Sequence, residues 1–589
     1  MSPTPSDESF GSFKDLFKSK GEKVPEEEPS AKDRGWTLEY GDEASSTRDS
    51  DADVGRGETP RERIEARPEG FGPMDTGPPC YSDEESEEME LVGSFRIRTI
   101  FPKDVIAEVQ NLPADPAPED WAGRLDLREE TIFTIDGEDA KDYDDAIGIK
   151  ALEGGGVEFS VHIADVGHYV CPGTRLDEEA LARATSVYLP DQVVPMLPEE
   201  LSNNLCSLVE GRDRLAFSVF MSFDEEGERT GYHVRKTVIR SVKRNTYRAV
   251  QELLDGEDTE AAREIEHLRE PLELFAKWAR VQQARRDAQG SLRMQSRERK
   301  ILFDDQHEVE AIVDAPRYFS QTLIEETALA ANQAVGDYFR ERGLPTIYRV
   351  HPEKDPEEVE AVIKMLAEHG MRVPNKERLT GRDIARLIRA ARRKQNADAM
   401  IQRIMGLIER AVYEVHDHED VATHFGLARE AYLHFTSPIR RYPDLIVHRW
   451  LHGIASGEPG AEDMIRTEDF LEDLNEVAQH ASIRADIAEM AERAIGDLKI
   501  CQFMDPHRGE TMDARVIRVM PAGMEVLLTE YNVSAFLPTR AIGQRGSTKG
   551  PTLTIQVGRG HRSFTEGYSI SVLLKDVDFL KLQLFLELA

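Results

Sequence analysis

The stretch that decides the fold runs from Thr131 to Asp145 and reads TIFTIDGEDAKDYDD. Its first five residues, 131–135, predict a strand, because β-branched and aromatic side chains pack well on a pleated sheet. The ten residues that follow carry six carboxylates, and a second strand is predicted at 157–163, where VEFSVHI alternates apolar and polar side chains. The sequence therefore predicts a sheet that carries an acidic loop between two strands.

Apolar residues take on a helical spacing between about 257 and 505. The period is clearest in two runs: Leu323, Thr327, Ala330 and Ala331, then Phe470, Leu474, Val477 and Ala478. Pro271 is expected to break a helix and Pro443 to start one, because proline lacks the amide hydrogen that an inner helical turn needs. The middle of the chain is therefore predicted to be mostly helical.

Short β-like runs return after Pro506. They are DARVIRV at 513–519, MEVLL at 524–528, SAFL at 534–537 and SISVLL at 569–574. About eighty residues with such runs fit a small closed barrel of the oligonucleotide-binding (OB) kind. The expected fold class is thus an α+β domain, with a mixed sheet and many helices, followed by a small all-β OB barrel.

The chain is strongly acidic, with 111 Asp and Glu against 74 Lys and Arg and a net charge of −37. Residues 1–90 are rich in Ser, Pro, Gly and acidic residues and are expected to form a disordered tail, for which a protein partner stays open. Such a charge is unusual for a nucleic-acid binder, which needs a local basic surface. Two explanations stay open: a basic channel inside an acidic shell, or a salty cytosol in which an acidic surface keeps the protein soluble.

No apolar run approaches the roughly 18 residues of a membrane span, and MSPTPSDESF at 1–10 lacks the pattern of a secretory signal. We therefore expect a cytoplasmic protein with no membrane partner. The cysteines form no C-x-x-C pair and suggest neither disulfides nor a zinc knuckle: Cys80, Cys171, Cys206 and Cys501. Two histidine groups lack a third ligand at a useful spacing and are assigned no metal: His448 with His452, and His416 with His418.

The acidic loop predicts a metal site, because six neighbouring carboxylates repel one another unless a cation neutralises them. Oxygen ligands favour hard cations such as Mg²⁺ or Mn²⁺. Two such ions stabilise both the attacking and the leaving oxygen in phosphodiester cleavage. The alternatives are a solvated acidic turn and a calcium loop, although the flanking helices and final glutamate of a calcium hand are not evident.

A second motif, HFTSPIRRYPD at 434–444, places two hydroxyls, a turn and two arginines before a predicted helix. The planar fork of arginine suits phosphate oxygens, so one of Arg440 and Arg441 is a candidate for the scissile phosphate. The alternative that both arginines pair with the abundant carboxylates stays open at this point.

Together these two motifs make the chain resemble the ribonuclease II and ribonuclease R family of processive 3′-to-5′ exoribonucleases. Further matching segments follow one another in the same order: TIDGED at 134–139, ADV at 164–166, TSVYLP at 185–190, VPMLP at 194–198 and LSNNLCSL at 201–208. The resemblance covers about residues 101–589. With it the chain divides into four parts: an acidic tail at 1–90, a lead-in at 91–130, an RNB-type catalytic domain at 131–505 and an RNA-binding OB domain at 508–589.

The resemblance implies a role for each site residue. The residues that match the metal-binding aspartates are Asp136, Asp142, Asp144 and Asp145. Mg²⁺ is the expected ion, with Mn²⁺ as a substitute. Arg440 matches the arginine at the scissile phosphate, and Arg441 is its helper.

The same resemblance implies how single-stranded RNA, the expected partner, is held. Tyr188 looks like the aromatic residue that clamps RNA in the channel, and Tyr247 like the tyrosine that packs on the last nucleotide. Glu325 or Glu326 resembles a glutamate near that nucleotide, and Met294 stands where the family often has a stacking phenylalanine. The remaining candidates for RNA contact are the hydroxyls of Thr436 and Ser437.

The resemblance ends at the N-terminus, where family members usually carry two cold-shock barrels and this chain has its acidic tail. We therefore expect weaker, more salt-sensitive capture of RNA through the C-terminal barrel. The family implies two-metal hydrolysis of single-stranded RNA to nucleoside 5′-monophosphates in RNA turnover. The sequence does not fix the oligomeric state, for which a monomer is favoured. Two alternatives stay open: a catalytically silent RNA-binding regulator of the same fold, and a nuclease whose substrate is DNA.

Overall fold

The computed structural model describes residues 87–289, 291, 299–304, 306–352, 354–368, 370–373, 379, 381–393, 397–417, 423–427, 429–543, 546–549 and 552–589. Most of the predicted tail lies outside the described residues, as do Met294, Cys80 and His418. Residues 87–90, which the sequence assigned to the tail, form the first turn of helix α3 (Glu87–Ser94). The helix begins there because Val92 is buried against the long helix that precedes the barrel, Glu468–Met504.

Five strands form a central sheet in the order β1-β8-β7-β4-β3. Their bounds are β1 (Leu125–Asp126), β3 (Asp145–Ala151), β4 (Val157–Ala164), β7 (Asp213–Phe223) and β8 (Arg229–Arg240). β1 runs parallel to β8 and the other neighbours are antiparallel, so the sheet is mixed, as predicted. The strand predicted at 157–163 is β4.

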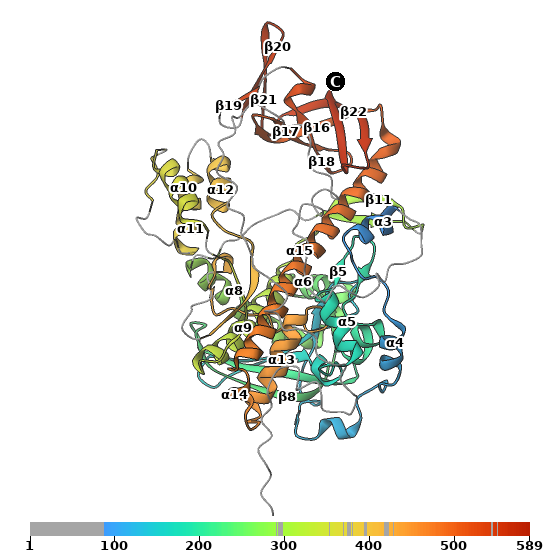
Figure 1. The fold of residues 1–589 in the computed structure, drawn as a ribbon, viewed down its shortest axis with the longest axis vertical. Helices are drawn as coiled ribbons and strands as arrows, with labels where there is room; N and C mark the ends of the chain where they lie inside the picture. The colour runs from blue at the N-terminus through green and yellow to red at the C-terminus, as the bar shows by residue number, and fades with distance from the viewer. Residues whose placement is uncertain are drawn as a thin grey trace, which may run out of the picture.

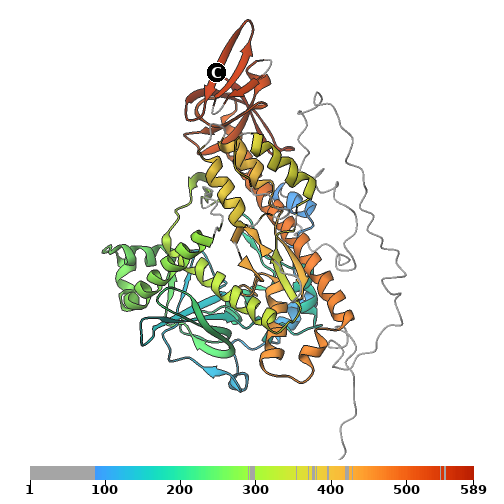
Figure 2. The same ribbon diagram turned by 90° about the vertical axis from the view of Figure 1, so that its left-hand side faces the viewer.

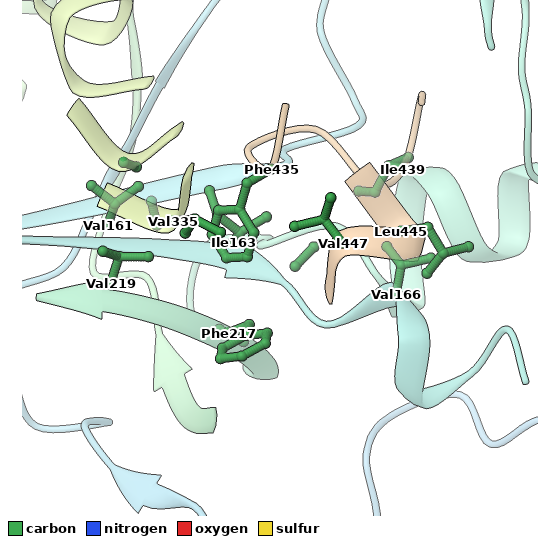
Figure 3. Packing of buried hydrophobic residues seen from close by; sticks show 14 of the residues in the cluster. Val161, Ile163, Val166, Phe217, Val219, Val335, Phe435, Ile439, Leu445 and Val447 are labelled. Atoms are coloured by element: carbon green, nitrogen blue, oxygen red, sulfur yellow. The ribbon is translucent and has the colours of Figure 1, made fainter. Parts of the chain in front are cut away.

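The main core lies on this sheet (Figure 3). β4 contributes Val161 and β7 contributes Phe217, and these pack with Val335 of helix α9 (Phe319–Glu341) and Val447 of helix α13 (Tyr442–Ala455). Each such side chain contributes about 1.5–3 kcal/mol by leaving water. This packing fixes β3 and β4, and with them the end of the acidic loop at Asp145.

Two pairs of short strands flank the sheet. β2 (Thr134–Asp136) pairs in parallel with β9 (Arg244–Thr246), and β5 (Val187–Tyr188) pairs with β6 (Val193–Val194). The strand predicted at 131–135 is therefore shifted toward the aspartates, because its partner is β9. Helix α6 (Tyr247–Asp255) follows β9 at once, with Thr246 Oγ1 accepting from the amide of Ala249 as its N-cap. Asp136 and the start of α6 are thereby placed side by side.

Helices dominate the middle of the chain, as predicted (Figure 1). Besides α3, α6, α9 and α13, the α-helices described before the barrel are α4 (Lys103–Gln110), α5 (Arg175–Arg183), α7 (Glu260–Glu264), α8 (Arg269–Gln289), α10 (Pro356–Glu368), α11 (Gly381–Ala391), α12 (Ala397–Met405), α14 (Ala461–Met464) and α15 (Glu468–Met504). Pro443 stands in the first turn of α13, as predicted. The prediction of a helix break at Pro271 is wrong, because this proline lies in the first turn of α8, where its missing amide hydrogen costs nothing.

The helical prediction missed six strands between residues 299 and 430. They form three two-stranded hairpins or ladders: β10 (Arg299–Phe303) with β11 (Val309–Asp314), β12 (Thr346–Val350) with β13 (Val412–His416), and β14 (Thr423–His424) with β15 (Arg429–Glu430). Single-turn helices connect several elements: 3₁₀ turns at Pro118–Trp121, Val166–His168, Glu266–Leu268, Phe425–Leu427, Asp505–His507 and Thr539–Ala541, and a π turn at Leu201–Leu205.

The C-terminal part is a small β-barrel, as predicted (Figure 1, upper part). Its main sheet has the order β18-β17-β16-β22-β23, and β18 also contacts β23, which closes the barrel. The strands are β16 (Thr511–Met520), β17 (Gly523–Leu528), β18 (Val533–Pro538), β22 (Ser569–Asp578) and β23 (Gln583–Leu588). A three-stranded sheet is inserted between β18 and β22: β19 (Gly546–Lys549), β20 (Thr552–Val557) and β21 (Gly560–Thr565).

Two elements join the barrel to the rest of the described chain (Figure 2). Helix α15 runs up to the barrel and gives Cys501 and Met504 to the barrel core. The β10–β11 hairpin adds Ile312 to the same core, and Arg299 Nη2 donates to Ser534 Oγ of β18 at 2.5 Å. Within the described part of the chain, no helix combines the length and the apolar character that a membrane crossing requires.

Candidate active site

The acidic loop is fixed at both ends and in its middle. Asp136 is the last residue of β2 and Asp145 the first residue of β3. Arg244 of β9 donates from Nη2 to two loop carbonyl oxygens, at 2.6 and 2.8 Å. Ser207 Oγ accepts from the amide of Tyr143 at 2.9 Å and donates to another loop carbonyl oxygen at 2.8 Å. These bonds turn the loop back on itself, so that its aspartates converge.

Burial raises the pKa of three of the converging aspartates, and neighbouring carboxylates add to the shift for Asp136 and Asp144. Burial raises the pKa of Asp136, and the carboxylates of Asp145 and Asp142 raise it further. Burial also raises the pKa of Asp144 well above its usual value, although the Arg440 guanidinium acts against this shift. Burial raises the pKa of Asp145 as well. The site therefore concentrates negative charge in a place with little water to screen it.

Two oxygens in this site have no hydrogen-bond partner among the described residues: Asp136 Oδ2 and Asp144 Oδ2. Buried polar atoms are normally paired, so unpaired carboxylate oxygens fit a cation. No three or more His, Cys, Asp or Glu side chains in the described ranges are arranged so that they could hold a metal ion as they stand. The fit to a cation therefore rests on charge and on unpaired oxygens, and the choice of Mg²⁺ or Mn²⁺ stays a prediction.

The turn before α13 lies against the acidic loop and carries Arg440. The amide of Ile439 donates to Asp144 Oδ1 at 2.9 Å, which ties the turn to the loop. Arg440 Nε lies 3.6 Å from Asp144 Oδ2, and its Nη2 donates to Ser437 Oγ at 3.2 Å. The Arg440 side chain is 46% exposed, so its guanidinium is accessible to a phosphate beside the carboxylates.

Arg441 has a different environment. Its guanidinium donates two hydrogen bonds to the buried carboxylate of Asp444, at 2.9 and 2.8 Å, and Asp444 also accepts from the amide of Ser437 at 2.8 Å. Arg441 thus holds the turn together instead of facing the aspartates. Thr436 and Ser437 are 4% and 3% exposed, and this burial favours a role in shaping the turn over the predicted direct contact with RNA.

Both predicted tyrosines lie beside the acidic loop. The Tyr188 hydroxyl donates to Asp142 Oδ2 at 3.4 Å, and its ring is 38% exposed, which leaves it accessible to a base. Tyr247 starts α6. Its neighbour Thr246 pairs with Asp136 across β9 and β2, and both burial and the carboxylates of Asp145 and Asp136 raise the pKa of the Tyr247 phenol.

The two candidate glutamates differ in exposure. Glu326 is 1% exposed and accepts two hydrogen bonds from Arg286 of α8, at 3.0 and 2.5 Å. Glu325 has a side chain that is 43% exposed and accepts one bond from the same guanidinium at 2.8 Å. Glu326 is therefore an internal partner of Arg286, and Glu325 is the one of the two that reaches the surface. Met294 lies outside the described residues.

The histidines that were assigned no metal pack or pair locally. His448 stacks on Phe435 with ring centroids 4.1 Å apart, and its ring shares a hydrogen bond with the Phe435 carbonyl oxygen at 2.7 Å. Burial lowers the pKa of His448 to about 4, so its ring is neutral near pH 7. His416 lies 2.9 Å from Glu414, and His452 lies 3.1 Å from the hydroxyl of Ser456.

Three residues that support the site were not identified from the sequence: Ser207, Arg244 and Arg286. Ser207 lies within the matching segment LSNNLCSL, so a signal for it was present. Arg244 and Arg286 are single arginines without a telling spacing, and only the fold shows that they reach the acidic loop and the glutamates.

An aspartate-lined site beside an exposed arginine, on a mixed sheet followed by a β-barrel, defines a candidate nucleic-acid hydrolase. The family model for the RNB domain matches residues 124–457, which is more than half of the chain. The chain therefore belongs to the RNB-domain family, and the resemblance found in the sequence is confirmed.

Individual relatives agree with this assignment. Ribonuclease R of Thermotoga maritima is 39% identical over 438 residues, which are 74% of this chain and 61% of that protein. Among solved structures, Mycoplasma genitalium RNase R in complex with ribose methylated single-stranded RNA is 24% identical with a TM-score of 0.72, covering 85% of this chain and 77% of that one. Yeast Ssd1, a pseudonuclease, is 19% identical with a TM-score of 0.58, covering 81% and 59%. The chain spans 54% to 65% of the length of the curated relatives it matches.

Proposed function

We propose that this protein is a processive 3′-to-5′ exoribonuclease that hydrolyses single-stranded RNA to nucleoside 5′-monophosphates. One observation carries the proposal: buried Oδ2 atoms of Asp136 and Asp144 accept no hydrogen bond in the described part of the chain, and that of Asp144 lies 3.6 Å from Nε of the exposed Arg440 guanidinium. Phosphodiester hydrolysis needs a site for cations next to a group that binds the reacting phosphate. Membership of the RNB family supports the direction and the processivity.

Each residue has a distinct part in this reaction. The residues that would hold Mg²⁺, or Mn²⁺ as a substitute, are Asp136, Asp142, Asp144 and Asp145. When bound, such ions activate water and stabilise charge on the attacking and leaving oxygens. Arg440 binds the scissile phosphate, and Arg441 keeps the turn in place through Asp444.

The RNA partner is held by stacking and by the barrel. Tyr188 and Tyr247 stack on bases near the acidic loop, and stacking of this kind contributes about 1–3 kcal/mol per base without regard to sequence. The exposed Glu325 is assigned to the terminal nucleotide. We assign residues 508–589 to accessory RNA binding, 131–505 to catalysis, 91–130 to a lead-in and 1–90 to an acidic tail. RNA turnover in the cytoplasm is the process in which such an activity is used.

The proposal is tested by digesting a 5′-labelled single-stranded RNA with Mg²⁺, beside a matched DNA strand. The key variant is Asp144→Asn, which keeps the shape of a buried side chain and removes its charge. Asp139→Asn is the matched control, because Asp139 belongs to the same loop but has a side chain that is 86% exposed. We expect progressive shortening of RNA by the wild type and by Asp139→Asn, and none by Asp144→Asn.

Other outcomes separate the alternatives. Equal shortening of DNA would contradict the RNA substrate. RNA binding without any shortening, across a range of salt concentrations, would favour a silent RNA-binding protein of the same fold, to which the resemblance to the pseudonuclease Ssd1 lends some support. The presence of all four aspartates and of Arg440 counts against that alternative.

A further inference from the structure

Tyr188 lies on a short hairpin, residues 187–194, whose own strands cannot fix its position. Strands β5 and β6 contribute two pairs of residues, Val187 with Val194 and Tyr188 with Val193. A two-stranded hairpin of this size is at best marginally stable by itself in water. The position of the Tyr188 ring therefore depends on the elements that the hairpin contacts.

Helix α15 supports this hairpin with an apolar face. Val187, Leu189 and Val194 of the hairpin are buried in one cluster with side chains of the helix. Apolar burial has no preferred direction, so it holds the hairpin on the helix without fixing where the hairpin lies along it. Polar contacts with a defined geometry are needed for that. The helix side chains in the cluster are Ala488, Ala491, Ala494, Ile495 and Leu498.

Two polar side chains of α15 bind the hairpin at separate points. Glu492 Oε1 accepts from the Tyr188 amide at 2.7 Å. Lys499 Nζ lies 3.4 Å from Oδ2 of Asp191, which stands in the turn between the two strands. Glu492 and Lys499 are seven residues apart, which corresponds to about two helical turns and about 10 Å along the helix axis. Contact at both points fixes the position of the hairpin along α15.

The contact between Lys499 and Asp191 is shielded from water. The two side chains are 5% and 12% exposed. Lys499 is the one ion-pair partner of Asp191 in the described part of the chain, where the buried Oδ1 of Asp191 accepts no hydrogen bond. A buried carboxylate needs a paired cation, because its charge is costly to remove from water. Asp191 therefore depends on Lys499 far more than a carboxylate in a surface ion pair depends on its partner.

Lys499 also contacts two other elements. Its ammonium pairs with Glu88 of α3 and lies over the Phe303 ring of β10, 5.4 Å from the ring centroid. β10 belongs to the β10–β11 hairpin, which adds Ile312 to the barrel core. Lys499 thus lies where α3, the hairpin of Tyr188 and the base of the barrel meet on the upper part of α15 (Figure 1).

We propose that Lys499 is a positioning residue for RNA binding: through Asp191 it fixes the hairpin of Tyr188, and with it the ring on which a base stacks, relative to α15 and the barrel. The inference rests on the proposed function, because stacking on Tyr188 is part of it. Of the two carboxylates that pair with Lys499 among the described residues, Asp191 belongs to this hairpin and Glu88 does not. Removing the charge of Asp191 therefore displaces the ring, whereas removing that of Glu88 leaves it in place.

The test is a titration of the full-length protein with a short, fluorescently labelled single-stranded RNA in EDTA, so that binding is measured without hydrolysis. Asp191→Asn should bind the RNA about fivefold more weakly, which is the lower end of the loss for one stacked base. Glu88→Gln removes the same charge from the same lysine and should bind at least as tightly as the wild type. Loss of a negative charge by itself strengthens binding to phosphates, so weaker binding by Asp191→Asn points to the displaced ring.

Two further comparisons separate positioning from a general loss of structure. In a protein that already carries Tyr188→Ala, Asp191→Asn should have no further effect on RNA affinity, because no ring is left to position. Lys499→Met should bind RNA as weakly as Asp191→Asn does, and Lys499→Arg, which keeps the positive charge, should bind it as the wild type does. If Lys499→Met does not fold, Asp191→Asn decides the question, because it leaves Lys499 paired with Glu88.

The inference is overturned if Asp191→Asn binds RNA as tightly as the wild type, if Glu88→Gln weakens binding to the same extent, or if the effect of Asp191→Asn persists in the Tyr188→Ala protein. Tyr188→Ala alone distinguishes this failure from a failure of the proposed function. If it binds RNA as the wild type does, the stacking assigned to Tyr188 fails and this inference fails with it. If it binds more weakly while Asp191→Asn does not, this inference alone fails.

Discussion

Replacing Arg441 by alanine should make the protein easier to unfold. The guanidinium donates two hydrogen bonds to Asp444, whose side chain is 0% exposed. Without Arg441, the Asp444 carboxylate is a buried charge that keeps only the amide of Ser437 as a partner. Breaking a buried pair in this way costs about 3–5 kcal/mol, and we expect a loss of that size in the free energy of unfolding. Arg441→Lys keeps the positive charge but cannot donate the two parallel hydrogen bonds to Asp444, so its free energy of unfolding should fall by less.

The adjacent Arg440 is the internal comparison. It is 46% exposed and lies 3.6 Å from Asp144, so Arg440→Ala should change the free energy of unfolding by less than about 1 kcal/mol. Its loss should instead slow RNA hydrolysis on the order of a hundredfold to a thousandfold. Urea unfolding followed by tryptophan fluorescence, together with the rate of RNA shortening, measures both quantities. The reasoning is refuted if Arg441→Ala is as stable as the wild type, or if Arg440→Ala is the less stable of the two.

Three further predictions concern other parts of the catalytic region. Asp144→Asn should abolish hydrolysis while the melting temperature does not fall, because burial already opposes the charge of Asp144; a lower melting temperature would contradict this. Tyr188→Ala should weaken binding of short RNA by about 1–3 kcal/mol in a fluorescence titration, and unchanged affinity would argue against stacking. Asp165 is buried, which raises its pKa, but Lys236 and Arg124 outweigh burial and lower it overall. Its stabilising effect is therefore present above its unfolded pKa of about 3.9 and lost as the pH falls below that value, and Asp165→Asn should flatten this part of the stability profile.

The parts of the fold that sequence could predict are those set by local pattern. The strand β4 and the strands of the barrel could be predicted, because the alternation of apolar and polar side chains in a half-buried strand is visible in the local sequence. Among the strands that were missed between 299 and 430, β12 and β13 are defined by long-range pairing. β12 pairs Thr346 with His416, seventy residues further on, and β12 is a buried five-residue run inside a helical region.

The site divides in the same way. The aspartates are contiguous in sequence, and Arg440 stands in a matching motif, so the sequence was enough to identify both. The arginines that hold the acidic loop and the glutamates could not be identified from the sequence. Arg244 and Arg286 contact residues that lie about a hundred and about forty positions away along the chain. The sequence could not tell which of two neighbouring residues faces the site, for Glu325 and Glu326 or for Arg440 and Arg441. Their different exposure in the structure distinguishes the members of each pair.

The length of helix α15 sets the distance between Tyr188, the proposed RNA clamp, and the barrel. Glu492 Oε1 of this helix accepts from the Tyr188 amide at 2.7 Å, and the helix ends at Met504, which packs in the barrel core. These twelve residues span about 18 Å at 1.5 Å each. Stacked nucleotides rise about 3.4 Å each, so about five of them cover the same span. For an RNA strand that follows α15, we therefore expect that at least about five nucleotides beyond Tyr188 are needed to reach the barrel, and that substrate length decides whether the barrel contributes to degradation.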